Sequence, residues 1–338
     1  MFTIFFMTVR MGPEMIRWPQ TPEEIHACRE PFTLGGLDGC IGSTDATTVI
    51  MEKVKADQKN LNSGWKEKHC VRNFNLTCNH RRRILNTTSG VPGRWPDKTT
   101  QKFDEFINEL HNGTLYKNEE YTYYTLDGVE KKGLGLWLLC DNGYIHWPCM
   151  IPPYKDEDAI NRRQTIWSHF VESMRKDVEC TFGILKGRWR ILCTGIRSYV
   201  SEQTLHAVDD IWFTCCILHN WLLDIDGLDD MWNMNVSEQA EFEMEETKSR
   251  NFGVIPKNIV HRLRNPRSGG NDKDIDTTSI GCKRAQCIED IDIFDNNYGV
   301  NSSNLPPFNE MRNRLVDSWN FLWNNHRIRW VGPKKKDN

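Results

Sequence analysis

The stretch CIGSTDATTV, residues 40–49, has the pattern of a buried β-strand with one carboxylate, Asp45, in its middle. A carboxylate in such a place is costly unless another group pairs with it or it coordinates a metal ion. Asp45 therefore requires a partner from elsewhere in the chain.

Three further segments predict the sheet to which this strand belongs. FNLTCN (74–79) and RILNTT (83–88) are short and closely spaced, which indicates an antiparallel meander with the first strand. LGLWLLC (134–140) is a continuous apolar run, as expected for a strand buried on both faces, and it stops at Asp141. We expect Asp141 to lie at the carboxyl end of that strand, where α/β proteins collect their ligands.

Several helices are expected around this sheet. One is predicted over about 97–110 with Asp97 as its N-cap, and a long amphipathic helix over about 163–187. An apolar helix is expected over about 202–223, and the closing segment LVDSWNFLWNNHRIRW (315–330) predicts another. Residues 189–196 are expected to be a short strand or an extended segment. Glu179 follows Val178 of the long helix and so borders its apolar stripe.

Asp45, Asp141 and Glu179 could therefore converge from two neighbouring strands and a covering helix. Converging carboxylates suit hard divalent cations, and two such ions can support phosphodiester cleavage. Spacing alone is weak support, because the chain has 46 acidic residues. The alternatives are a solvated or capped strand end for Asp45, a plain turn residue for Asp141 and a solvated helix position for Glu179.

Composition narrows the class of protein without deciding it. The net charge of −3 neither indicates nor excludes a nucleic-acid-binding protein, so the local arrangement of Lys and Arg has to decide. The 12 cysteines are scattered and have no paired C-x-x-C, which predicts reduced, buried thiols in the cytosol or nucleus. No apolar run suggests a membrane span, and the first residues lack the features of a signal peptide.

Taken together, five segments resemble transposases of the PIF/Harbinger type and their domesticated relatives, the DDE superfamily endonucleases. They occur in the family's order over roughly residues 36–224, and they are IGSTDATTV, FNLTCNHRRRILNTTSGVPGRWPDK, LLCDNGYIHWPCMIPP, ESMRKDVECTFGILKGRWRIL and IWFTCCILHNWLL. The resemblance implies an α/β fold with a ribonuclease-H-like mixed sheet flanked by helices. It adds N- and C-terminal segments that are helical or irregular.

The resemblance also implies a DDE triad that holds Mg²⁺ or Mn²⁺, with Asp45, Asp141 and Glu179 at the three positions. The implied reaction is hydrolysis at transposon ends, followed by attack of the freed 3′-hydroxyl on target DNA. Two departures stand out: Thr48 occupies a position where relatives often have His, and only about 40 residues precede the Asp45 strand, fewer than in most relatives. A Myb/SANT-like DNA-binding partner, a homo-oligomer and a nuclear location, with the cytosol as a second location, are further expectations.

The expected organisation has four parts. Residues 1–34 are an N-terminal remnant, 35–224 the nuclease domain, 225–305 an acidic and largely flexible linker, and 306–338 a C-terminal helix with a basic tail.

Basic residues gather around the proposed triad and suggest a DNA contact surface. The candidates are Arg81, Arg82, Arg83, Arg175, Lys176, Lys186, Arg188 and Arg190. The alternative is that they are solvated charges or local ion pairs; Arg175 and Glu179, four residues apart, share a helix face. Trp95 could stack on an unpaired base, although loop packing is the simpler role. Cys215 and His219 do not complete a zinc site and are expected to pack in a buried helix.

Two other functions stay open from the residues alone. A decayed or domesticated protein would keep the fold and act as a DNA- or protein-binding module. A phosphoesterase acting on RNA or small substrates would use the same triad.

Overall fold

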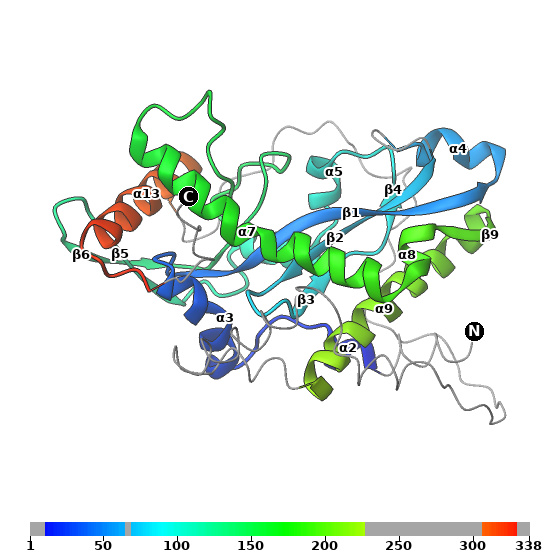
Figure 1. Cartoon of the computed structure of the whole chain (residues 1–338), viewed down its shortest axis with the longest axis horizontal. Coiled ribbons are helices and arrows are strands. Elements are labelled where there is room, and N and C mark those ends of the chain that lie inside the picture. The colour runs from blue at the N-terminus through cyan, green and yellow to red at the C-terminus, as the bar shows by residue number, and fades with distance from the viewer. Residues whose placement is uncertain (1–10, 65–68, 227–305, 330–338) are drawn as a thin grey trace, which may run out of the picture.

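The computed structural model describes residues 11–64, 69–226 and 306–329. Its centre is a seven-stranded mixed sheet in which the order of the main path is β3-β2-β1-β7-β8 (Figure 1). Strands β1 (Cys40–Val54), β2 (Cys70–Cys78) and β3 (Ile84–Thr87) form the expected antiparallel meander. Strands β7 (Trp137–Leu139) and β8 (Met150–Ile151) run parallel to β1. This arrangement confirms the predicted ribonuclease-H-like α/β fold.

Strand β1 is longer than predicted and pairs with a further strand beyond the meander. Its far end pairs in parallel with β9 (Ile196–Val200), while β4 (Val91–Pro92) pairs with β2. Residues 189–196, expected to be extended, instead include helix α8 (Arg190–Thr194), and β9 begins just after it.

The long helix α7 (Arg162–Arg188) lies across one face of the sheet and agrees closely with the predicted helix (Figure 1). Its apolar stripe serves two clusters of core residues. Trp167, Val171 and Met174 pack with Trp137 in one cluster, whereas Val178, Phe182 and Leu185 belong to the other, around Phe74 and Trp212. Helix α7 is thereby held against the sheet along its whole length. Its packing fixes where each of its polar residues lies relative to the strands.

The remaining helices complete the layers. Helices α2 (Gly12–Met15), α3 (Pro22–Leu34) and α4 (Ala56–Asn62) flank β1 in the chain, and η2 (Glu202–Thr204) precedes α9 (Leu205–Asp226). A capping box of Thr21 and Glu24 starts α3. The predicted closing helix is α13 (Phe308–Asn324), which begins earlier than expected. Both α3 and α13 supply residues, such as Phe32 and Trp319, to the same core cluster as β7.

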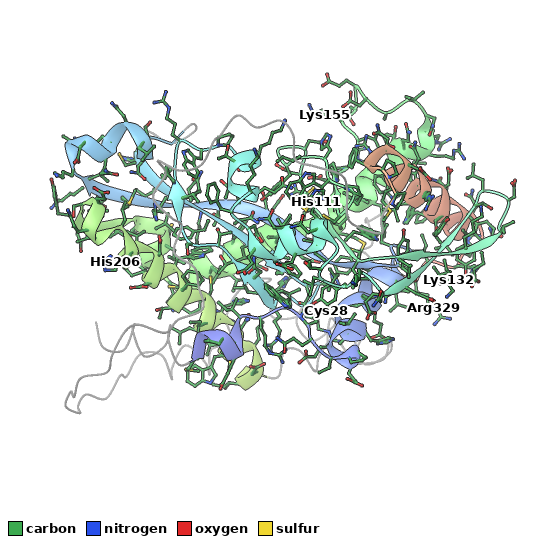
Figure 2. All side chains as sticks on the ribbon, turned by 180° about the vertical axis from the view of Figure 1, so that it is seen from behind. Cys28, His111, Lys132, Lys155, His206 and Arg329 are labelled. Atoms are coloured by element: carbon green, nitrogen blue, oxygen red, sulfur yellow. The ribbon has the colours of Figure 1, made fainter. Side chains whose placement is uncertain are left out.

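One expected helix was wrong in detail, and one hairpin was not predicted. The single helix expected over 97–110 is two helices, α5 (Asp97–Gln101) and α6 (Glu105–Asn112); Pro96 is the N-cap of α5, and Asp104 caps α6 by accepting from Ile107 N at 3.1 Å. The polar segment after α6 forms a hairpin of β5 (Glu120–Tyr124) and β6 (Glu130–Leu134). Figure 2 shows Lys132 of this hairpin at one end of the molecule and His206 of α9 at the other.

The expected linker 225–305 lies almost wholly outside the described residues, as does the basic tail. Within the described ranges, no helix has both the length and the apolar character needed to cross a membrane.

Candidate active site

Asp45 and Asp141 are brought together by the register of two parallel strands. Ser43 of β1 pairs with Leu139, the last residue of β7, so Asp45 lies two residues further along β1 and Asp141 two residues beyond the end of β7. Because side chains alternate along a strand, Asp45 points to the same side as Ser43. Asp141 lies close enough that its charge raises the pKa of Asp45. The loop after β7 also turns back on its own carboxylate: Gly143 N donates to Asp141 Oδ1 at 2.7 Å. Both residues lie where the sequence predicted.

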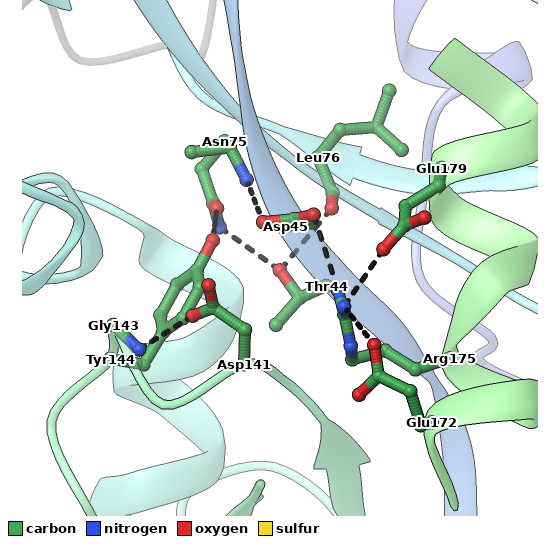
Figure 3. Close-up of polar contacts among 11 residues, drawn as sticks. Thr44, Asp45, Asn75, Leu76, Asp141, Gly143, Tyr144, Glu172, Arg175 and Glu179 are labelled. Atoms are coloured by element: carbon green, nitrogen blue, oxygen red, sulfur yellow. Dashed lines mark hydrogen bonds and ion pairs between the residues drawn. The ribbon is translucent and has the colours of Figure 1, made fainter. Parts of the chain in front are cut away.

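Glu179 of α7 is linked to Asp45 through the guanidinium of Arg175, which lies between the two carboxylates. The guanidinium of Arg175 donates from Nη1 to Asp45 Oδ2 at 3.3 Å and from Nη2 to Glu179 Oε1 at 2.8 Å. Nη2 also donates to Glu172 Oε1 at 3.0 Å. Figure 3 shows Arg175 between the strand and the two glutamates of the helix. The partner that Asp45 required is thus Arg175.

The electrostatics of Asp45 remain unfavourable in spite of this ion pair. Burial raises its pKa to about 6, and the charges of Asp141 and Asp97 act in the same direction, while Arg175 opposes them. Burial by itself would lower the pKa of Arg175, but its hydrogen bond to Glu172 and the nearby carboxylates raise it above the ordinary value. Burial of the Asp45 carboxylate is therefore only partly offset by its ion pair with Arg175.

Asp97 is a fourth carboxylate of the site that the sequence did not reveal as such. A Cβ on Gly143 would lie 2.8 Å from Asp97 Oδ2 and 2.9 Å from Asp141 Oδ1, so both oxygens face the same small space. The sequence predicted an N-cap at this position because Asp97 follows Pro96 at the start of a helix. The same stretch, PGRWPDK, lies within one of the segments that resemble the family, and that was the available signal.

A buried polar network supports the strand and loop beneath these carboxylates. Asn75 of β2 donates to Thr44 Oγ1 at 3.1 Å and to Asp104 Oδ2 at 2.6 Å, and it accepts from the Tyr144 hydroxyl. Tyr144 lies three residues after Asp141 and is fully buried. The network thus ties the loop that carries Asp141 to β1 and β2 (Figure 3). Burial raises the pKa of Asp104 to about 6, against the effect of the hydrogen bond from Asn75.

The donor set suits a hard divalent cation only in part. Carboxylate oxygens are the ligands that Mg²⁺ and Mn²⁺ prefer, and Asp45 and Asp141 present such oxygens close to one another. Glu179 instead bonds to Arg175. Within residues 11–64, 69–226 and 306–329, no group of three or more His, Cys, Asp or Glu is arranged to hold one metal ion. Asp45 and Asp141 therefore supply oxygens that such an ion prefers, with Asp45 Oδ2 already bonded to Arg175, and Glu179 would join them once its own bond to Arg175 is exchanged.

Comparison with known proteins identifies the family over the same part of the chain. The model of the DDE superfamily endonuclease family matches residues 44–220, a range that includes Asp45, Asp141 and Glu179. The chain belongs to the DDE superfamily endonucleases. Protein ALP1-like of Arabidopsis thaliana is 26% identical over 217 residues, which are 64% of this chain and 50% of that relative. The chain thus spans about half the length of this curated relative. No solved structure matches it.

Family membership confirms the resemblance to transposase-derived nucleases that the sequence indicated. Thr48, which replaces the His that relatives often have, does not lie beside the carboxylates of this DDE endonuclease. Thr48 pairs with Asn73 in the unbroken register between β1 and β2, and it is three residues from Asp45. Since side chains alternate along the strand, Thr48 points to the opposite face of the sheet.

The basic residues predicted to contact DNA have different environments. Arg175 is buried and bonded to three carboxylates, so its guanidinium faces the site instead of solvent, as the alternative of local ion pairs held. Arg83 is bonded to Asp224, and Arg82 lies in a turn with φ of 64°. Lys176 and Arg190 are exposed, and the other candidates, Arg81, Lys186 and Arg188, are half-buried. The exposed pair on α7 and α8 is thus the part of the set that is open to a polyanion.

Three other residues that the sequence singled out have packing roles. Trp95 stacks on Phe103 with ring centroids 5.1 Å apart. His219 is fully buried in α9, where its Nε2 contacts the Arg82 carbonyl at 2.8 Å and burial lowers its pKa to about 4. Cys215 is buried beside it. Most described cysteines are buried free thiols as predicted, but Cys180 and Cys193 are exposed.

Proposed function

We propose that this protein is a metal-dependent DNA endonuclease of transposon origin. The observation that carries the proposal is the register of β1 and β7, which sets Asp45 beside Asp141 under the helix that carries Glu179. The family match over the same residues supports it. Two divalent ions, when bound, would activate a water and stabilise the leaving oxygen of a phosphodiester. We further propose that the freed 3′-hydroxyl attacks target DNA.

In this proposal each side chain has a defined task. Asp45 and Asp141 would hold Mg²⁺ or Mn²⁺, and Glu179 would complete the ligand set from α7. The exposed charges of Lys176 and Arg190 bind phosphates of the DNA backbone. Since members of the family that the chain resembles often act with a separate DNA-binding protein, a Myb/SANT-like partner is part of the proposal. A homo-oligomer and a nuclear location belong to it as well.

The test is a nicking assay on DNA that carries the ends of the element, with Mg²⁺ or Mn²⁺ supplied. Asp45→Ala, Asp141→Ala and Glu179→Ala should each abolish nicking while circular dichroism shows a folded chain. Asp57→Ala, a change in an exposed carboxylate of α4, is the matched control and should nick normally. Nicking that survives Asp141→Ala would show that the triad is wrongly assigned. RNA substrates in the same assay test whether the triad serves a different phosphoesterase.

A second candidate is a non-catalytic module that keeps the fold and binds DNA or a protein. The bond between Glu179 and Arg175 favours it, since that bond occupies an oxygen of the third carboxylate. Calorimetric titration with Mn²⁺ separates the two candidates. An enzyme should bind Mn²⁺ through Asp45, whereas a non-catalytic module should show the same absence of binding as Asp45→Asn.

A further inference from the structure

A single buried guanidinium serves three carboxylates at the centre of this site. The side chain of Arg175 is 7% exposed, whereas those of Glu172 and Glu179 are 42% and 46% exposed. Glu172, Arg175 and Glu179 are spaced by three and four residues, so they share one face of α7. Among the described residues, the buried Arg175 Nε has no hydrogen-bond partner. The guanidinium is thus fixed in place but does not use all of its donors.

We propose that Arg175 is a built-in competitor of the divalent cation, and that Glu172 retains the guanidinium when Glu179 turns to the metal. This inference rests on the proposed function, because it concerns the same carboxylates. Two of the three oxygens bonded to Arg175, Asp45 Oδ2 and Glu179 Oε1, belong to groups that would bind the metal.

The exchange is physically feasible because only the mobile partner has to move. Glu179 is nearly half exposed and can rotate toward Asp45 without repacking the core, while Arg175 stays fixed by its burial. Glu172 keeps its hydrogen bond to Nη2, so the guanidinium is not left buried without a counter-ion. Glu172 is therefore a positioning residue: it does not touch the metal, but it sets how readily Glu179 becomes free.

The experiment is a titration of the full chain with Mn²⁺, in which bound ion is counted by electron paramagnetic resonance without any substrate. Arg175→Gln removes the competitor and should tighten Mn²⁺ binding about fivefold, the size of one partly exposed ion pair. Glu172→Gln leaves Arg175 more dependent on Glu179 and should weaken binding about threefold. Arg163→Gln is the matched control: it removes the same charge from the same helix, at an exposed ion pair with Asp317, and should change nothing.

The two variants must move affinity in opposite directions. If Arg175→Gln weakens Mn²⁺ binding while the wild type binds normally, Arg175 only orders the site and this inference is overturned, although the proposed function stands. If neither the wild type nor Arg175→Gln binds Mn²⁺, both the proposed function and this inference fail. If Arg175→Gln does not fold, Glu172→Gln still tests the inference. Mn²⁺ binding by Glu172→Gln that equals or exceeds that of the wild type contradicts competition between Arg175 and the metal.

Discussion

Asp45→Asn should make the protein more stable at pH 8 while removing its ability to bind a divalent cation. Asp45 sits in a strand with its side chain 19% exposed, and its pKa is raised from 3.8 to about 6 by burial and by Asp141 and Asp97. A raised carboxyl pKa means that the folded protein disfavours the ionised form. Asparagine has nearly the same shape and carries no charge, so it removes that penalty.

The size and pH range of the effect follow from the same shift. Two pKa units correspond to about 3 kcal/mol in the free energy of unfolding. As the pH falls, Asp45 binds a proton in the folded chain before it does so in the unfolded chain. The free-energy penalty for its ionised form is therefore full above pH 6, shrinks between pH 6 and 4, and is absent below pH 4. The gain in stability for Asp45→Asn should therefore be about 2–3 kcal/mol at pH 8 and near zero at pH 4.

Urea unfolding at pH 8, 6 and 4, followed by circular dichroism in the presence of a chelator, measures this difference directly. Asp57→Asn, at an exposed position, is the control and should stay within about 0.5 kcal/mol of the wild type at every pH. A less stable Asp45→Asn at pH 8 would refute the reasoning. It would mean that the ion pair with Arg175 outweighs the cost of burying the carboxylate.

Three further changes test other parts of the site. Gly143→Ala should weaken Mn²⁺ binding about tenfold in calorimetry with little change in stability, because its Cβ would displace only the ends of two carboxylates. Asp104→Ala should lower the free energy of unfolding by about 3 kcal/mol, since Asn75 and Asn86 lose their buried acceptor. Trp95→Ala should cost about 1–2 kcal/mol through the lost stacking on Phe103, with unchanged affinity for single-stranded DNA in fluorescence anisotropy.

The elements with strong periodicity were predictable, and so was the position of the carboxylates on them. The run LGLWLLC indicated a strand buried on both faces, and β7 is fully buried between β1 and β8. The apolar stripe of α7 predicted that helix to within a residue or two. The β5–β6 hairpin was missed because β6 is polar and almost wholly exposed, so that strand has no alternation of apolar residues.

The burial and ion pairs of Arg175 could not be predicted from the sequence of α7 alone. Its spacing from Glu179 was visible in the sequence, and from that alone a DNA contact and an ion pair were both reasonable. The burial of Arg175 depends on Asp45, which lies 130 residues earlier in the chain and approaches α7 only when β1 forms the centre of the sheet. The distinction between a DNA contact and an internal counter-ion is thus set by tertiary packing.

The same reasoning applies to Asp97, which faces Asp141 only because the loop through Gly143 folds back over the end of β7. Local patterns therefore place each carboxylate on its element, and the strand register decides which charges must share one site.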